Sequence, residues 1–547
     1  MIFVRAQFDV GNAAALETEF SRQRPHARGE CVVIDVAGER VGHTGSIESP
    51  AMSSSFPLYD TLAARSLDER ATALLGGDSY VLMQRAGQAA WRHVLEYWPQ
   101  AQRIAVLCGP GNNGGDGYVL ARAALRSGRH VSVVHLREHV PRTPSAQRAC
   151  TEYVSAGGHV DLFDEGRFED VLPSADLWVD ALFGIGLSRA PDAATTRLIT
   201  ALNQQTAPVL ALDVPSGVDA DRGQVPGAAV LATRTLQFIS EHLGLRTGAA
   251  LEYTGACALD DLDVPLAAFE FIEPSAHGLA QDALARWLLP RRRNTHKGES
   301  GRVLCIGGDH GSGGAIALCA EAALRAGCGL LRVATRSEHV APILARRPEA
   351  MVRAVESGAD LEPSLQQSDV IALGPGLGQG EWGRALFALA LRDKQRWVID
   401  ADGLNLLAES NAIDVSGAIL TPHPGEAARL LGVDTHDVQQ DRFTAAQALA
   451  KQFDAVVVLK GAGTIIAAPG QAPSVIDAGN PGMAVGGMGD LLTGIIASLY
   501  AQGLPAYEAA CAGALLHGLA GDAAAREGER GLLPSDLLPL LRRLANP

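Results

Sequence analysis

Aromatic residues and positive charge are both scarce in this sequence. Phe, Trp and Tyr make up 5% of the chain, and 46 Lys and Arg stand against 61 Asp and Glu, for a formal net charge of −15. Surfaces that bind nucleic acid usually combine basic side chains with stacking aromatic rings. We therefore expect no nucleic-acid partner. Anion binding by backbone N–H groups remains open, because it requires no basic side chain.

Closely spaced cysteines and long apolar runs are missing too. The eight cysteines are scattered and none forms a Cys-x-x-Cys pair, so neither a zinc site nor a disulfide framework is indicated. A reducing cytoplasm is the expected location. The most apolar stretch, residues 491–507, includes polar residues and a proline. It predicts a buried helix, because a membrane span needs about 20 mostly apolar residues, and we expect no contact with a membrane.

The chain is instead long and alternates strands with helices. Its 547 residues are too many for one hydrophobic core, since cores stop growing near about 250–300 residues. Short β-branched runs alternate with helical segments, which predicts parallel sheets built from βαβ units. These runs form two groups, at residues 103–109, 130–136, 176–184 and 207–214, and at 301–308, 330–335, 369–376, 396–403, 418–426 and 455–461. We expect two α/β domains, residues 52–272 and 280–547, each with its own sheet.

The first 51 residues differ from the rest of the chain. Residues 22–31 and 40–51 show neither helical nor strand periodicity, and a helical pattern starts only at Leu58. We expect residues 1–51 to be a disordered tail, or a segment upstream of a native start at Met52. A genuine N-terminal arm is the alternative, and the intact mass of the native protein distinguishes the two.

A glycine-rich loop follows the first strand of the first domain. The strand RIAVLCG runs directly into GPGNNGGDGYVLARAAL, residues 109–125. A strand, a glycine turn and a helix direct backbone N–H groups and the helix dipole toward an anion. Many glycine-rich turns of this kind are ordinary turns. Asn112, Asn113 and Asp116 inside this loop favour coordination of a ligand or a cation.

Two further strand ends of this domain carry polar side chains. Asp180 ends the strand in VDALFGIGLSR, and Asp213 and Ser216 follow the strand in LALDVPSGVDADRG. In open parallel sheets the ligand crevice lies beyond the carboxyl ends of the strands. A single Asp at a strand end is often only a helix N-cap. Three such ends, all with oxygen-bearing side chains, predict one common site.

These three blocks resemble the signatures of the NAD(P)H-hydrate epimerase family, whose fold is a Rossmann-like, three-layer α/β domain. The resemblance spans about residues 56–265. It implies substrate contacts by Asn112, Asn113, Gly114, Gly115, Asp116, Gly184, Ile185, Gly186, Leu187, Ser188, Arg189 and Asp213. It also implies a potassium ion held by Asn113, Asp180 and Ser216, and acid–base catalysis by Asp213. One departure is His242, which stands where the family usually has a lysine.

The second domain begins with a similar strand, glycine loop and helix. This segment is HKGESGRVLCIGGDHGSGGAIAL, residues 296–318, with Asp309 in the loop. The next strand end, GPGLG at residues 374–378, offers only backbone contacts and space. These glycines predict the wall of a ligand pocket.

Charged side chains stand at two further strand ends of the second domain. His423 and Glu426 lie between a strand and a helix, and His423 is equally well explained as a polar residue at a helix start. In VVVLKGAGTII, Lys460 and Thr464 bracket two glycines. That spacing suits a hairpin-like turn that holds a nucleotide phosphate.

The strongest motif is NPGMAVGGMGDLLTGIIASLYAQG, residues 480–503. Gly486, Gly487 and Gly489 precede Asp490, which opens an apolar helix. Successive glycine N–H groups at a helix start form an anion hole suited to a phosphoryl group in transfer. Asp490 can act there as a base toward a hydroxyl group. It can also be the N-cap of the helix, and the two roles are compatible.

This Gly-x-Gly-Asp at a helix start is similar to that of ribokinase-like α/β folds. With LTPHPGEAARLL, IDADGLN and KGAGT it resembles the ADP-dependent NAD(P)H-hydrate dehydratases, over about residues 280–547. The resemblance implies nucleotide contacts by Lys460, Gly461, Ala462, Gly463, Thr464 and Gly489, and hydrated-substrate contacts by Ala315, Gly376, His423 and Asp490. It implies ADP as co-substrate, with Mg²⁺. Sugar and vitamin kinases of this fold often have Asn-x-x-Glu where this chain has His-Pro-Gly-Glu, which argues against a plain vitamin kinase.

The two resemblances imply one pathway. Hydrated NADH and NADPH, written NADHX and NADPHX, carry water at C6 of the nicotinamide ring in R and S forms. The first domain is expected to interconvert these forms, and the second to remove water from the S form while ADP becomes AMP and phosphate. The alternatives are a small-molecule (vitamin) kinase fused to a cofactor-binding domain, and a non-catalytic binding module. We also expect a homo-oligomer, because Ala- and Gly-rich helices can pack tightly between subunits.

Overall fold

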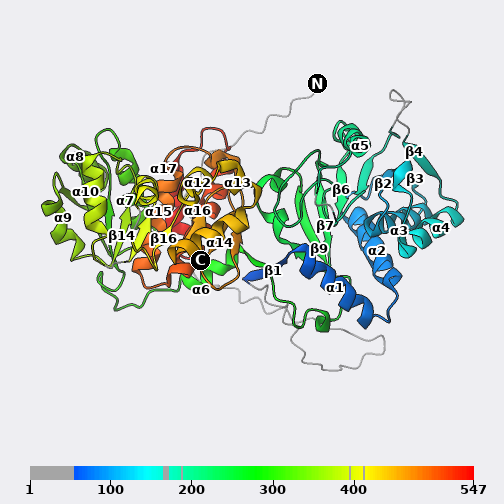
Figure 1. Ribbon diagram of the computed structural model, residues 1–547, viewed down its shortest axis with the longest axis horizontal. Coiled ribbons are helices and arrows are strands. Elements are labelled where there is room, and N and C mark those ends of the chain that lie inside the picture. The colour runs from blue at the N-terminus through cyan, green and yellow to red at the C-terminus, as the bar shows by residue number, and fades with distance from the viewer. Residues whose placement is uncertain (1–53, 164–171, 187–188, 394–395, 411–412) are drawn as a thin grey trace, which may run out of the picture. The chain divides into compact units, whose positions relative to one another are not determined.

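The computed structural model describes residues 54–163, 172–186, 189–393, 396–410 and 413–547 (Figure 1). The expected tail, residues 1–51, lies outside these described residues, and so do Leu187 and Ser188. None of the helices in the described ranges is both long enough and apolar enough to cross a membrane.

The first sheet consists of seven parallel strands in the order β4-β3-β2-β5-β6-β7-β9. Their bounds are β2 Arg103–Cys108, β3 His130–Leu136, β4 Val160–Phe163, β5 Leu177–Ala181, β6 Val209–Leu212, β7 Arg234–Phe238 and β9 Ala256–Asp260. The chain builds outward from β2 in both directions. The strand order therefore reverses between β2 and β5, and a ligand crevice forms at such a point. This is a Rossmann-like order, as expected for the first domain.

Helices cover both faces of this sheet. Successive residues of a strand point to opposite faces, and in β2 Ile104 and Val106 join one core while Ala105 and Leu107 join another. The first core contains residues of α2 (Ser79–Tyr97), α3 (Asn112–Arg126) and α4 (Pro144–Ser155), and the second contains residues of α5 (Ala193–Asn203). The expected three-layer arrangement is confirmed.

The second sheet is larger and mixed. Its order is β13-β12-β11-β14-β15-β16-β17-β18-β19-β10-β1-β8. Seven strands are parallel, namely β11 Arg302–Ile306, β12 Leu330–Thr335, β13 Met351–Ala354, β14 Val370–Leu373, β15 Trp397–Ile399, β16 Ile419–Leu420 and β17 Val456–Leu459. The others are β18 Thr464–Ala467, β19 Ser474–Ile476, β10 Ala276–Leu279, β1 Ser55–Tyr59 and β8 Glu241–His242. The antiparallel β17–β18 pair supplies the predicted hairpin-like turn at Lys460.

Strands from both halves of the chain share this second sheet. β1 pairs antiparallel with β10 and parallel with β8, and β10 pairs with β19. β1 and β8 lie within residues 52–272 of the sequence, the segment that also forms the seven-stranded sheet. The expectation that each half has a sheet of its own is therefore wrong, because backbone hydrogen bonds join β1 and β8 of the first half to the second sheet.

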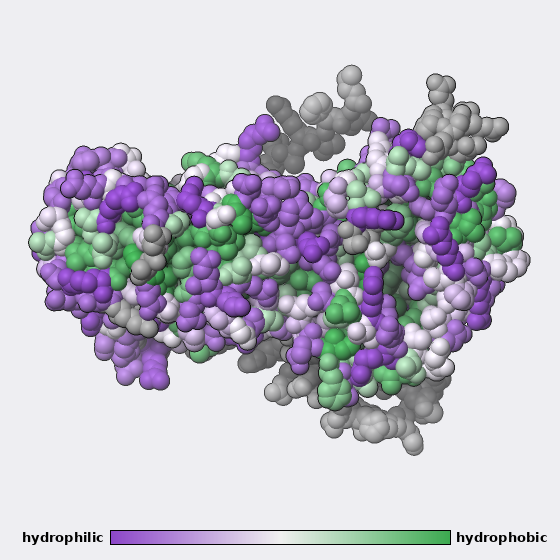
Figure 2. All heavy atoms as spheres, in the orientation of Figure 1, coloured by the Kyte–Doolittle hydropathy of each residue, from purple (hydrophilic) through white to green (hydrophobic). Residues whose placement is uncertain are grey.

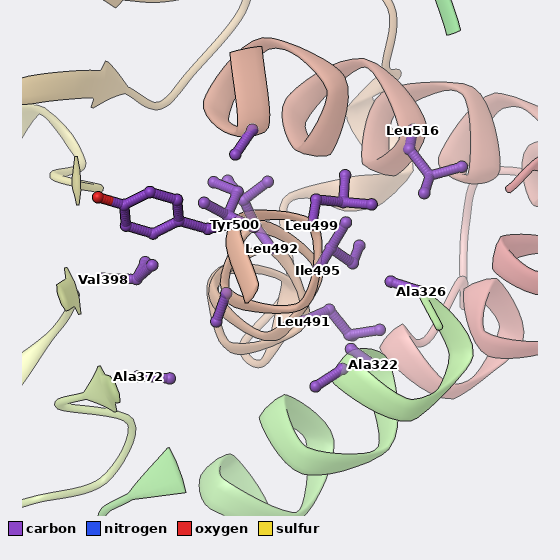
Figure 3. Packing of buried hydrophobic residues seen from close by; sticks show 14 of the residues in the cluster. Ala322, Ala326, Ala372, Val398, Leu491, Leu492, Ile495, Leu499, Tyr500 and Leu516 are labelled. Atoms are coloured by element: carbon purple, nitrogen blue, oxygen red, sulfur yellow. The ribbon is translucent and has the colours of Figure 1, made fainter. Parts of the chain in front are cut away.

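Helix α15 forms the centre of one core of the second sheet. Nearly every residue from Met488 to Ala501 is buried, as expected of a helix that is apolar on all sides. Figure 3 shows α15 surrounded by Ala322 of one helix, Leu516 of another, and Val398 and Ala372 of the sheet. This face is covered by α7 (Gly313–Arg325), α15 (Met488–Ala501), α16 (Ala506–Ala525) and α17 (Pro534–Leu544).

The opposite face has its own helices and core. It is covered by α9 (Gly358–Leu365), α10 (Glu381–Ala390), α11 (Asp402–Glu409), α12 (Pro424–Leu431), α13 (Thr435–Gln440) and α14 (Arg442–Phe453). The remaining helices are α1 (Thr61–Leu74), α6 (Leu284–Trp287) and α8 (Ser337–Arg346). Hydrophilic residues cover much of the face shown in Figure 2, with smaller apolar groups between them. The expected α/β fold class is confirmed for both sheets.

Two predicted helix boundaries were wrong. Leu58 belongs to β1, and α1 begins only at Thr61, where the Asp60 carboxylate accepts a hydrogen bond from the Ala63 N–H and caps the helix. The apolar run predicted as one helix to residue 507 ends at Ala501. Gly503 then adopts a φ of 103° and Pro505 precedes the separate helix α16, because proline favours a helix start and disrupts a helix interior.

Candidate active sites

A cavity of about 550 Å³ opens beyond the carboxyl ends of β2, β5 and β6. Eight of the predicted residues line it, namely Asn112, Asn113, Asp116, Gly184, Ile185, Gly186, Arg189 and Asp213. Gly114 and Gly115 do not. A Cβ atom on Gly114 would lie 2.0 Å from the carbonyl oxygen of Gly109, and one on Gly115 would lie 2.4 Å from the side chain of Met83. These two glycines permit close packing at the start of α3.

Asp180 and Ser216 do not line this cavity but form a hydrogen-bonded pair behind Phe183, which does. The buried Asp180 carboxylate accepts hydrogen bonds from the Ser216 N–H at 2.8 Å, the Ser216 Oγ at 2.7 Å and the Leu182 N–H at 3.1 Å. Burial raises the pKa of Asp180 to about 6, and the hydrogen bonds from Ser216 oppose that rise. Hydrogen bonds therefore hold this carboxylate in place, and no cationic side chain is among the groups that shift its pKa.

The Asn113 side chain is buried next to the cavity without a hydrogen-bond partner. Neither its Oδ1 nor its Nδ2 atom has a partner among the described residues. Buried polar groups are normally paired, so an unpaired amide at a cavity wall indicates a ligand or ion. Asn113, Asp180 and Ser216 all offer oxygen atoms, which suits a hard cation. No described group of three or more His, Cys, Asp or Glu is arranged for a metal.

Asp213 occupies a backbone conformation that is rare outside glycine. Its φ is 66°, and backbone strain of this kind costs about 1–3 kcal/mol and is concentrated at functional sites. Its carboxylate lies 2.9 Å from Nε2 of His242 and accepts a hydrogen bond from the Ile185 N–H at 3.3 Å. A Cβ atom on Gly184 would lie 2.6 Å from Asp213 Oδ2. A side chain at position 184 would displace this carboxylate from its observed place.

His242 occupies a buried position behind Asp213. Its side chain is only 2% exposed, and its Nδ1 atom has no hydrogen-bond partner among the described residues. A carboxylate can only accept, so Nε2 is the donor in the hydrogen bond to Asp213.

Two other carboxyl groups face the same cavity, and sequence reasoning missed one of them. Asp68 lies on the face of α1 that also presents Ala64 and Thr72. Although its side chain reaches solvent, burial of the carboxyl end and the Asp213 charge raise the pKa of Asp68 to about 7. Burial, then the charges of Asp213 and Asp68, hold the pKa of Asp116 well above its usual value. Only the three-to-four spacing of the α1 residues could have indicated Asp68.

The second candidate site lies where β15, β16 and β17 end and α15 begins. The Lys460 Nζ atom is 2.7 Å from Asp400 Oδ1 and 3.6 Å from Glu426 Oε2. Asp400 is buried and its other oxygen accepts a hydrogen bond from Thr493 Oγ1 at 2.7 Å. A Cβ atom on Gly489 would lie 3.4 Å from the Lys460 ammonium. The positive charge thus lies directly below the glycine loop, in an ion pair that sequence reasoning did not foresee.

Asp490 lies in the first turn of α15 rather than at its N-cap. The helix starts at Met488, after Gly487 with a φ of 99°. Burial and the nearby Asp400 charge raise the pKa of Asp490 to about 7, while Lys460 opposes the rise. His517 of α16 is buried, and burial followed by the Lys460 charge lowers the pKa of His517 to about 4. His517 is therefore neutral near pH 7.

The structure brings the predicted pocket residues Ala315 and Gly376 together. A Cβ atom on Gly376 would lie 3.2 Å from that of Ala315 and 2.7 Å from the Ser312 carbonyl oxygen. Gly376 also has a φ of 59°. Both the conformation and the space therefore favour glycine at this position.

His423 is the N-cap of α12 and stays partly accessible. Its Nδ1 atom accepts hydrogen bonds from the Gly425 N–H at 3.0 Å and the Glu426 N–H at 3.3 Å, and Glu426 accepts one from the His423 N–H at 2.7 Å. The ring is 55% exposed. Helix capping accounts for Nδ1, while Nε2 lies 3.5 Å from Glu426 Oε1 and the exposed part of the ring can meet a ligand.

The turn at residues 460–464 is built for close approach. Gly461 and Gly463 have φ values of 139° and 64°. Thr464 Oγ1 donates to the Gly461 carbonyl oxygen at 3.2 Å. The turn is also held by the first half of the chain, because the Gly463 carbonyl oxygen accepts a hydrogen bond from Thr247 Oγ1 at 2.8 Å and the Ala462 carbonyl oxygen accepts one from the Gly248 N–H at 3.0 Å.

Two family models and many curated proteins match this chain. Residues 79–244 match the model described as YjeF-related protein N-terminus, and residues 303–543 match the one described as NAD(P)H-hydrate dehydratase. A bifunctional NAD(P)H-hydrate repair enzyme of Escherichia coli is 45% identical over 88% of this chain and 92% of its own length. One of Coxiella burnetii is 45% identical over 90% of this chain and 99% of its own. One of Leishmania braziliensis is 38% identical over 88% of this chain and 92% of its own length.

Solved structures similar to this chain cover about half of it. A ribokinase-like superfamily protein of Enterococcus faecalis shares 33% identity with a TM-score of 0.47, covering 49% of this chain and 96% of its own. Another is an ADP/ATP-dependent NAD(P)H-hydrate dehydratase of Bacillus subtilis, co-crystallised with ATP and Mg²⁺. It shares 30% identity with a TM-score of 0.44, and the match covers 48% of this chain and 96% of the Bacillus chain.

Proposed function

The chain belongs to the family of bifunctional NAD(P)H-hydrate repair enzymes, and we propose that the site at Asp213 is its epimerase site and the site at Asp490 its dehydratase site. The enzyme interconverts the R and S forms of hydrated NADH and NADPH and dehydrates the S form. We assign the first reaction to residues 52–272 and the second to residues 280–547. This function replaces the small-molecule kinase as the interpretation of the second half.

The epimerase reaction requires one group that accepts a proton and one that donates a proton. When the C6 hydroxyl loses its proton, the oxygen forms a carbonyl group and the C6–N bond breaks. The bonding pair passes to the ring nitrogen, which takes up a proton. Closing the ring on the other face of the carbonyl inverts C6. Asp213 accepts the hydroxyl proton, and one of the carboxyl groups with a raised pKa, Asp68 or Asp116, supplies the other.

The conformation of Asp213 is the observation that carries this assignment. A φ of 66° places its carboxylate against His242 and the glycine loop, inside the cavity. His242 holds Oδ1 of this carboxylate, and the Ile185 N–H holds Oδ2 at the cavity wall. Such a fixed base near the reacting hydroxyl is what proton transfer requires.

Asn113, Asp180 and Ser216 are the proposed potassium ligands. The unpaired Asn113 amide and the buried Asp180 carboxylate support this choice. A bound potassium ion would supply positive charge to neutralise Asp180 and to attract the substrate's phosphates. The three residues position that charge at the start of α3, where the helix dipole also favours anions.

The dehydratase reaction is proposed to proceed through a phosphorylated intermediate, with ADP and Mg²⁺. Hydroxide is a poor leaving group, whereas phosphate departs readily. Asp490 takes the proton of the 6-hydroxyl group. The hydroxyl oxygen attacks the terminal phosphorus of ADP, and AMP leaves. The ring nitrogen then expels phosphate from C6, and loss of a proton from C5 gives the reduced nicotinamide. The N–H groups of residues 486–489 and the Lys460 ammonium below them stabilise the negative charge.

Two substrates separate the two assignments. With ADP, the full chain restores the absorbance of reduced nicotinamide from R-NADHX only if both sites are active. From S-NADHX it does so if the site at Asp490 alone is active. We expect Asp213→Asn to fail on the R form at the enzymatic rate and to act normally on the S form. We expect Asp490→Asn to produce no reduced nicotinamide from either form, while chromatography still shows that the R and S forms interconvert. Wild-type rates in either variant would overturn the corresponding assignment.

A further inference from the structure

A second large cavity lies away from both sites. It measures about 960 Å³, against about 550 Å³ for the cavity at Asp213. Four parts of the C-terminal half form its walls: the segment 287–300, the C-terminal ends of α7 and α15 with the residues that follow them, residues 347 and 349 just after α8, and the end of α17. Residues 300 and 327, which come just before β11 and β12, are among them. The cavity therefore opens at the amino ends of the strands, opposite the glycine loops.

Helix α15 links this cavity to the proposed dehydratase site and separates the two. Asp490 lies in its first turn, while Leu499 and Gln502 at its end line the cavity. A helix rises about 1.5 Å per residue, so the twelve positions between Asp490 and Gln502 correspond to roughly 18 Å. One small ligand cannot occupy both places.

Arginine side chains dominate this cavity. Five of them line it with only two carboxylates, in a protein whose net charge is −15. They are Arg291, Arg292, Arg325, Arg347 and Arg542, and the carboxylates are Glu299 and Glu349. The cavity is thus a positive region on an acidic protein, and such regions concentrate anions.

Three of these arginines have no partner in the described part of the chain. Arg291 is fixed to Gln502 Oε1 at 2.8 Å, and Arg347 pairs with the buried Glu321. The side chains of Arg292, Arg325 and Arg542 form no hydrogen bond or ion pair with any described residue. Their guanidinium groups are free to bind a ligand.

Helix dipoles explain only part of this cluster. Arg325 lies in the last turn of α7 and Arg542 in the last turn of α17, where a cation is favoured without any ligand. Arg292 lies in an exposed segment outside any helix, so no dipole accounts for it. Dipoles also do not explain why all three arginines line one hollow.

An apolar wall adjoins the arginines. Trp287, Leu288 and Leu289 line the cavity, and Leu289 is 70% exposed. Trp287 packs against the main core on one side and faces the cavity on the other. A ring stacked on these side chains would cover apolar surface that water now touches, a favourable exchange.

We propose that this cavity is a binding site for an organic polyphosphate such as a nucleoside diphosphate. Guanidinium groups bind phosphate oxygens in pairs of parallel hydrogen bonds. Arg292, Arg325 and Arg542 hold the diphosphate, and Trp287 and Leu289 contact the base. The site is distinct from the proposed nucleotide site at Lys460 and does not depend on that assignment.

The stoichiometry of ADP binding tests the proposal. Equilibrium dialysis of the full chain with labelled ADP is compared with the triple variant Arg292→Ala, Arg325→Ala, Arg542→Ala. The matched control is Arg126→Ala, Arg137→Ala, Arg353→Ala, which removes the same charge from exposed positions outside the cavity. We expect two ADP per chain in the wild type and the control and one in the cavity variant, with the dehydratase rate unchanged. Pyrophosphate should displace the second ADP, since its diphosphate is the recognised group.

Other results would overturn the proposal. One ADP per chain in all three proteins would show that the cavity holds no nucleotide, and displacement by adenosine but not by pyrophosphate would show that the arginines do not bind phosphate. If the cavity variant sediments as a smaller species than the wild type and the wild type binds one ADP, the cavity holds a second copy of the chain instead. Arg325→Glu alone should weaken the binding of the second ADP by about tenfold or more. That single change covers the case in which the triple variant does not fold.

Discussion

Nε2 of His242 lies 2.9 Å from Oδ1 of Asp213, at the position where the sequence resemblance leads us to expect a lysine. The imidazole is buried, and its other nitrogen has no partner in the described part of the chain. A buried histidine therefore orients the proposed base here, where a lysine would do so with an ammonium group. The chain keeps a donor to Asp213 despite the change of residue.

Replacing His242 should slow epimerisation selectively. We expect His242→Ala to reduce the epimerase kcat by about 10²-fold, a typical effect of losing a group that assists general-base catalysis. His242→Lys should restore much of the rate, because the ammonium can donate to Asp213. Dehydration of S-NADHX is the internal control. An unchanged epimerase kcat in His242→Ala would contradict a role for the contact.

Potassium should stabilise the protein through Asn113, Asp180 and Ser216. A ligand that binds only the folded state raises the unfolding temperature by mass action. We expect potassium chloride to raise the Tm relative to tetramethylammonium chloride at equal ionic strength, and Asn113→Ala to remove the difference. Asn112→Ala is the matched control, since the Asn112 side chain is bonded to Thr143 instead. An equal potassium effect in both variants would argue against the site.

The dehydratase rate should rise with pH through about 7. Asp490 acts as a base only when deprotonated, and its pKa is raised to about 7 by burial and the Asp400 charge. Measured with S-NADHX and saturating ADP, kcat is expected to increase from about pH 6 to about pH 8 and then level off. Asp213→Asn should show the same profile. A rate independent of pH across this range would exclude Asp490 as the base.

The buried Lys460–Asp400 ion pair should be costly to break on one side. Lys460→Met leaves the Asp400 carboxylate buried without its partner, and such changes typically cost about 3–5 kcal/mol. We expect a clear fall in Tm by calorimetry. The double variant Asp400→Asn, Lys460→Met should recover part of the loss, because no charge is then left unpaired. If both variants lose the same stability, the pair does not act as a unit.

Asp68 should destabilise the folded protein above neutral pH. Its pKa is raised from 3.8 to about 7 on folding, so the folded state binds the proton more tightly than the unfolded state does. The stability that this proton contributes is present below about pH 4 and lost as pH rises toward about 7. Asp68→Asn should therefore have a higher Tm than the wild type at about pH 8, and the two should converge near pH 4. A difference independent of pH would contradict this.

Strands with a strong local signal were predicted, and those that depend on distant partners were not. β3 and β12 occupy the predicted residues 130–136 and 330–335 without change, because their β-branched residues favour strands locally. β8 has only two residues and exists through its pairing with β1. No local pattern distinguishes such a segment from a loop.

The same distinction applies to the two sites. Asp213 and Asp490 stand in glycine-rich motifs at the ends of predicted elements, so their positions could be inferred from the order of the sequence. Asp400 was part of a recognised block, but its ion pair with Lys460 joins residues sixty positions apart. Asp68 lies on an otherwise ordinary helix. The packing of α1 decides that Asp68 lines the cavity, and the sequence of the helix alone does not predict this packing.

Pairing of β10 with β19 and β1 has a consequence for how this chain can be divided. A fragment starting at residue 280 would lack β10, β1 and β8, so β19 would become the last strand of its sheet. The main-chain groups of Ser474–Ile476, now bonded to β10, would be left open to another molecule. Exposed apolar edge strands promote self-association. A fragment that begins before Ala276 keeps β10 but exposes its other edge, which now pairs with β1, so the two activities are best produced as one polypeptide.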